Sequence, residues 1–169
     1  MSQYYPRIKR QYDQLQGDST ELFRELIVLA NEIGMDAALA DLERCVTEKR
    51  LAWLKKNFDE GGKTSAPVAD GYRWFYEKYL HVSVPQDGEI VERSQNRIVM
   101  RWWNPCPTLE ACKKFGLDTR EICKKAYQNP VQEFLGQIHS NLRFKRNYEQ
   151  IRPYAAYCEE IIEWMVEKD

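Results

Sequence analysis

Apolar side chains recur every three or four residues through the first part of the chain, which is the spacing of amphipathic helices. Asp18 and Glu21 form a capping-box pair before the first run, and Gly34 closes that run. A second, longer run follows directly, and a third begins near Pro67, a residue type favoured in the first helical turn. The pattern predicts three helices within a helical part at residues 1–79.

The pattern changes to alternation beyond residue 80. Residues 89–93 and 97–103 alternate on either side of a polar turn, which predicts a β-hairpin. Residues 142–146 alternate in the same way and predict a further strand. Helical spacing returns between the hairpin and this strand in three segments: 108–115, closed by Gly116; 118–127, capped by Asp118; and one opened by Asn129 and Pro130.

Residues 157–166 allow two interpretations. Their apolar positions fit an amphipathic helix that starts near Pro153. The same residues are rich in the β-branched and aromatic side chains that are common in strands. Periodicity alone favours the helix.

The order of these elements predicts an α+β fold, with N-terminal helices packed on an antiparallel sheet that has a central hairpin. The length of 169 residues predicts one domain, 1–169. We expect its second part, 80–169, to contain the sheet and a turn built around Cys106 and Pro107.

Composition excludes several classes of function. The formal net charge is only -1, so we expect no nucleic-acid partner. No apolar run approaches the length needed to span a bilayer, and no apolar segment follows the N-terminus as in a signal peptide. We therefore expect no membrane partner, a cytoplasmic location, and five reduced cysteines.

Cys106 is the leading candidate for chemistry. Pro105 and Pro107 flank it and stiffen the turn, which leads into a predicted helix at Thr108. A helix N-terminus lowers the pKa of a thiol, so Cys106 could be a nucleophile or a metal-ligand thiolate, or else a small buried residue. The chain has no Cys-x-x-Cys pair of the kind typical of structural zinc sites, so we expect no metal and no other cofactor.

His139 is the candidate general base, because the unperturbed pKa of imidazole lies near neutrality. Its place at the end of a predicted helix also fits a histidine that only complements the helix dipole. Arg101 and Trp103 share one face of a predicted strand and could clamp a carboxylate, or form an exposed cation–π pair. The expected ligand-binding residues are Arg101, Trp103, Asn104, Cys123, Arg143 and Cys158.

Several short motifs, taken in order, resemble the L-2-amino-thiazoline-4-carboxylic acid hydrolase-like family. They are the helical segment 29–38, the strand that ends in Cys106-Pro107, Gly116, Cys123, Leu142-Arg143-Phe144 and Cys158-Glu159. The resemblance implies a small α+β protein in which residues 157–166 form a strand. It also implies hydrolytic opening of a cyclic thiazoline, although Tyr154-Ala155-Ala156-Tyr157 departs from the family's usual Gly-Asp.

Three functions stay open at this point. One is a hydrolase that acts on a small cyclic C–N or thiazoline-type substrate, with Cys106 as nucleophile and His139 as base. The second is a non-catalytic module of the vinyl-reductase type, which binds or senses a small molecule in an aromatic pocket. The third is an interaction protein that forms a homo-oligomer through its N-terminal helices.

Overall fold

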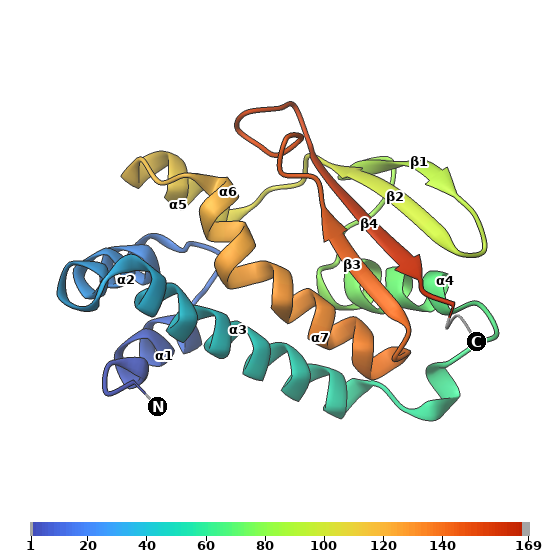
Figure 1. Cartoon of the computed structure of the whole chain (residues 1–169), viewed down its shortest axis with the longest axis horizontal. Helices are drawn as coiled ribbons and strands as arrows, with labels where there is room; N and C mark the ends of the chain where they lie inside the picture. The colour runs from blue at the N-terminus through green and yellow to red at the C-terminus, as the bar shows by residue number, and fades with distance from the viewer. Residues whose placement is uncertain (1, 167–169) are drawn as a thin grey trace. The chain divides into compact units, whose positions relative to one another are not determined.

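The computed structural model describes residues 2–166 and confirms the α+β class (Figure 1). Four strands form one antiparallel sheet: β1 Gly88–Arg93, β2 Arg97–Trp102, β3 Leu142–Arg146 and β4 Cys158–Trp164. The α-helices are α1 Tyr5–Asp13, α2 Thr20–Ile33, α3 Met35–Asn57, α4 Pro67–Tyr72, α5 Pro107–Phe115, α6 Thr119–Ile122 and α7 Gln128–Ile138. A 3-10 turn, η1, spans Glu60–Gly62, and π-helical turns span η2 Arg73–Tyr79 and η3 Cys123–Tyr127. Among residues 2–166, no helix is long and apolar enough to cross a membrane.

The chain packs as two compact units whose limits differ from the predicted division near residue 80. Unit 1 comprises residues 1–50 and 106–130, and unit 2 comprises 51–105 and 131–169. Two helices, α3 and α7, have residues in both units. Helical spacing predicts that a segment is a helix, but it does not say against which core each turn of that helix packs. The sequence pattern therefore could not predict that α3 and α7 are divided between the two units.

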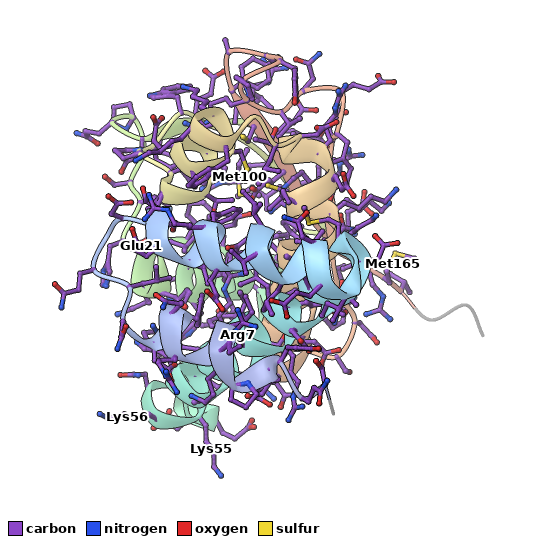
Figure 2. The ribbon with its side chains drawn as sticks, turned by 90° about the vertical axis from the view of Figure 1, so that its left-hand side faces the viewer. Arg7, Glu21, Lys55, Lys56, Met100 and Met165 are labelled. Atoms are coloured by element: carbon purple, nitrogen blue, oxygen red, sulfur yellow. The ribbon has the colours of Figure 1, made fainter. Side chains whose placement is uncertain are left out.

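Unit 1 is helical. Its core is formed by α1, α2, the first part of α3, α5, α6 and η3. Arg7 on α1 (Figure 2) donates to Glu25 at 2.6 Å and to Glu32 at 3.2 Å, which ties α1 to α2. The fully buried apolar side chains include Ile8, Phe23, Leu26, Leu29, Leu39, Leu42, Val46 and Ala126.

Unit 2 contains the sheet, in the order β1-β2-β4-β3. One face of the sheet is apolar, and we call it the core face. Ile98, Met100 and Ile162 on this face are almost fully buried. The helix α4 approaches the core face at Gly71, where an added Cβ would lie 3.1 Å from Leu142 Cδ1. Any larger residue at position 71 would force Leu142 to shift by a few tenths of an ångström, so glycine favours this close packing of helix on sheet.

The opposite face of the sheet, the polar face, carries paired charges. Glu159 on β4 accepts from Arg101 Nε at 3.0 Å, and Glu163 accepts from Lys145 Nζ at 2.7 Å. Arg97 approaches the same Glu163 at 3.7 Å. An antiparallel sheet with one buried and one polar face explains the alternation seen along these strands.

Residues 158–164 form a strand, as the family resemblance implied and against the helical periodicity. β4 pairs with β2 on one side, where Ile98 lies opposite Ile162, and with β3 on the other, where Phe144 lies opposite the same residue. A central position between two strands satisfies the backbone of β4 on both sides. This pairing outweighs an apolar spacing that, by itself, fits a helix.

Asn129 and Pro130 do not interrupt the chain of helices, although the sequence predicts a new start there. The segments α6, η3 and α7 run on without an intervening loop, with Pro130 at the third position of α7. A proline inside a helix removes one hydrogen bond and crowds the preceding turn. The turn directly before α7 is the π-helical η3, and such wider turns accommodate a disturbance of the regular α-helical bonding.

Candidate functional site

Cys106 lies at the N-cap of α5. Its backbone is extended, with φ −130°, and Pro107 occupies the first turn of the helix. The Sγ atom accepts the Leu109 backbone N–H at 3.4 Å. Donors at a helix N-terminus stabilise the thiolate form of cysteine, so this half-buried thiol has the local surroundings of a nucleophile.

Cys112 and Cys123 lie in the same unit as Cys106. Burial, and to a smaller extent the neighbouring Cys123 and Cys106 sulfurs, raise the pKa of the Cys112 thiol to about 12. Cys112 is buried in the apolar core, and a thiol with such a raised pKa stays neutral, as packing in an apolar core requires. Among residues 2–166, no group of three or more His, Cys, Asp or Glu side chains is arranged to bind a metal ion.

His139 follows the last residue of α7 and pairs with Asp70, a residue that the sequence pattern did not single out as a partner. His139 Nε2 lies 3.0 Å from Asp70 Oδ2. The Asp70 side chain is fully buried and also accepts from Thr64 N, Thr64 Oγ1 and Arg73 Nη2, at 2.8, 2.8 and 3.1 Å. A carboxylate that fixes one ring nitrogen orients the imidazole, as is typical of a general base.

The charge state of Asp70 follows from these contacts. Burial acts to raise its pKa, but hydrogen bonds from the Thr64 backbone, from His139 and from the Thr64 hydroxyl, together with the charge of Arg73, lower it below the ordinary value. Asp70 is therefore ionised beside His139. Because His139 belongs to unit 2 and Cys106 to unit 1, their pairing in catalysis stays a prediction.

Arg101 and Trp103 do not share a single environment. Arg101 lies on the polar face, with Nε 3.0 Å from Glu159 and its guanidinium 4.6 Å from the centre of the Tyr157 ring. The hydrogen bond to Glu159 is the main reason that the pKa of Arg101 is raised. Trp103 follows the end of β2, is 43% exposed, and donates from Nε1 to the Gln86 carbonyl at 3.0 Å. Glu89 also lies 3.7 Å from Arg101 Nη1, so a ligand carboxylate would compete with two carboxylates of the sheet for this guanidinium.

Two of the predicted ligand-binding residues, Asn104 and Cys158, are brought together by Arg152. Arg152 Nη1 donates to the Asn104 carbonyl at 2.7 Å, and Nε approaches Cys158 Sγ at 3.4 Å. The Arg152 backbone N–H lies at the same distance from this sulfur. Arg152 therefore ties the turn before Cys106 to the start of β4, across 48 positions of sequence. Nothing in the local pattern around Arg152 marks it for this role.

Arg143, the remaining predicted ligand-binding residue, is used locally. Its Nη1 donates to the Ser140 and Leu142 carbonyls, both at 2.9 Å. These bonds stabilise the turn between α7 and β3. Arg143 lies opposite Glu163, near the end of β4, whereas Cys158 is at the start of that strand. The structure therefore does not bring Arg143 together with Cys158.

A buried polar cluster on the core face was also missed by sequence reasoning. Tyr76 donates to Glu160 Oε2, and Arg146 Nη2 lies 3.3 Å from the other oxygen, Oε1. Burial, followed by the neighbouring charge of Glu160, raises the pKa of Tyr76 well above its usual value. The Trp102 ring stacks on Tyr76 at 4.9 Å, and its buried Nε1 has no hydrogen-bond partner in the described part of the chain. A charged residue at an inward position of a strand, two before Ile162, is the signal that could have revealed this cluster.

Comparisons of the chain with family models, with curated proteins and with solved structures find no match.

Proposed function

We propose that this protein is a thiol-dependent hydrolase that acts on a small cyclic C–N or thiazoline-type substrate, with Cys106 as the nucleophile. The observation that supports it is the Leu109 N–H directed at Cys106 Sγ on a proline-flanked helix N-terminus. Of the side chains available near neutral pH, a cysteine so placed is the strongest nucleophile. The order of short motifs also resembles that of the thiazoline hydrolase-like family, and this resemblance implies the same reaction class.

The reaction consumes one water molecule. The Cys106 thiolate attacks the ring carbon that carries the amidine and forms a C–S bond, while His139 takes up the thiol proton. The ring nitrogen receives that proton from His139. The exocyclic amino group then gives up a second proton, which His139 passes to the same nitrogen, and the ring C–N bond breaks as the carbon forms a C=NH bond. Water then loses a proton to His139 and adds to the same carbon, and the bond to Cys106 breaks. The product carries a carbamoyl group, and Cys106 regains its proton from His139.

Asp70 acts as a positioning residue in this scheme. Its contact at 3.0 Å fixes His139 Nε2, so the other ring nitrogen is the one that would accept and return protons. For the scheme to operate, that nitrogen must come within about 3 Å of Cys106 Sγ or be one water molecule away. An ionised Asp70 also stabilises the imidazolium that forms after each proton transfer.

The test is ring opening of a thiolactone and of a 2-aminothiazoline-4-carboxylate by matched variants. Cys106→Ser should lower the rate about a thousandfold, because the remaining groups cannot form the covalent intermediate. Cys45→Ala, which removes a buried thiol from the same unit, should retain activity. Asp70→Asn should lower kcat and shift its pH profile. Full activity in a folded Cys106→Ser variant would remove the thiol from the mechanism.

A further inference from the structure

Unit 2 carries an open hollow of about 560 Å³. It is lined from three places along the chain: the end of α4 and η2, the segment after η2, and the edge strand β1. Tyr72, Val82 and Ile90 contribute apolar surface. Glu77, His81 and Arg93 contribute groups that can carry charge. No cysteine lines this hollow, so what it binds is independent of the proposed hydrolysis.

The two opposite charges at the hollow do not neutralise each other. Within residues 2–166, neither Glu77 nor Arg93 forms an ion pair or a side-chain hydrogen bond. The Arg93 guanidinium lies 5.7 Å from the centre of the Tyr72 ring, and both charges are near enough to influence the Tyr72 hydroxyl. By contrast, the arginines of the neighbouring strand, Arg97 and Arg101, are paired with carboxylates of the polar face.

A β-bulge directs Arg93 toward the hollow. In a regular strand, side chains three positions apart point to opposite faces of the sheet. Here the register of β1 shifts between Ile90 and Glu92, so that Ile90 lies opposite Met100 and Arg93 lies opposite Ile98. Both partners belong to the core face, and the extra residue therefore places the apolar Ile90 and the charged Arg93 on the same side.

His81 occupies a backbone position that favours glycine. Its φ is +56°, just after the end of η2, where the Val82 N–H bonds to the Tyr76 carbonyl at 3.0 Å. The residue after a helix end in this left-handed conformation is usually glycine, because a Cβ is disfavoured there. A histidine at this position projects an imidazole into the lining of the hollow at a cost in backbone energy.

We propose that the hollow binds a small zwitterion with an apolar side chain, that is, a free α-amino acid of the leucine type. Arg93, assisted by His81, receives the carboxylate, and Glu77 receives the ammonium group. Tyr72, Val82 and Ile90 receive the side chain. A ligand that carried only a negative charge would leave Glu77 unpaired and repelled, whereas a zwitterion satisfies both charges.

The experiment is a titration of the whole protein with leucine, N-acetyl-leucine and leucinamide, in which NMR chemical shifts report binding. N-acetyl-leucine lacks the ammonium charge and leucinamide lacks the carboxylate. Leucine should bind roughly fivefold or more tightly than either analogue, which corresponds to one partly exposed ion pair for each charge. Arg93→Gln should abolish the preference over leucinamide, and Glu77→Gln the preference over N-acetyl-leucine.

Two further variants keep the result interpretable. Lys56→Gln removes an exposed positive charge at the end of α3 (Figure 2) and should leave binding unchanged. His81→Gly should unfold at a higher temperature than the native chain while it binds leucine more weakly, so lost binding cannot be attributed to lost folding. Absence of leucine binding, equal binding of leucine and N-acetyl-leucine, or an equal loss in Lys56→Gln would overturn the proposal. Arg93 would then serve only as an inward-pointing charge that protects an edge strand.

Discussion

Replacing Arg146 by methionine tests the buried polar cluster on the core face. Arg146 and Glu160 have only 8% and 13% of their side chains exposed, and two guanidinium nitrogens of Arg146 lie 3.3 Å from Glu160 Oε1. Methionine keeps most of the volume and removes the charge. Glu160 would then retain Tyr76 as its hydrogen-bond donor and lose the cation that balances it.

The magnitude follows from how much of Glu160 stays buried. Removing one partner of a buried ion pair costs about 3–5 kcal/mol of unfolding free energy, because a charge is left uncompensated. The bond from Tyr76 and the small exposure of Glu160 place this case at the low end, about 3 kcal/mol. For a chain of this length that corresponds to a fall of about 6–12 °C in Tm.

Urea unfolding followed by circular dichroism would measure the effect in a double-mutant cycle. Arg146→Met with Glu160→Leu removes both charges and should recover about 2 kcal/mol relative to the sum of the single variants. Lys145→Met is the matched control, since it breaks a 2.7 Å ion pair on the same strand at a side chain that is 59% exposed. That control should cost about 0.5 kcal/mol or less. Equal costs for Arg146→Met and Lys145→Met, or additive single variants, would refute the reasoning.

Three other perturbations test different parts of the structure. The pKa of Asp70 is lowered below 3.8, so its carboxylate stabilises the fold at neutral pH and loses this effect as pH falls below 3.8. The unfolding free energy of Asp70→Asn should therefore be lower than that of the native chain at pH 7, and the difference between the two should become smaller in acid. Gly88→Ala would place a Cβ 2.4 Å from the Arg101 carbonyl oxygen, and thermal unfolding should report a loss of about 3 kcal/mol, whereas an unchanged Tm would contradict this contact. Burial raises the pKa of Cys45 to about 11 and that of Cys112 to about 12, so mass spectrometry should find both unmodified after brief alkylation of the native protein at pH 8.

Local signals in the sequence were enough to define most elements and several of their ends. The hairpin forms where alternation predicted it, as β1 and β2. Gly116 ends α5 with φ +65°, and the Asp118 side chain accepts the Arg120 N–H at 2.8 Å at the start of α6. Caps, turns and hairpins depend on residues within a few positions of one another, so their chemistry can be read directly from the chain.

The sequence also located Cys106 correctly at a helix N-terminus. Two prolines and a following helical pattern made that prediction possible, and the Sγ contact with Leu109 N agrees with it. The roles of Cys106 as nucleophile and of His139 as base remain predictions. A residue's immediate surroundings are local information, whereas a catalytic pairing depends on distant parts of the chain.

Only the tertiary structure decided how distant residues are combined. Asp70 and His139 are 69 positions apart, and Tyr76 and Glu160 are 84 apart. Residues 158–164 became a strand because β2 and β3 flank them, although their apolar spacing also fits a helix. Such choices are set by backbone pairing and by the need to compensate buried charges, and both depend on which segments meet when the chain folds.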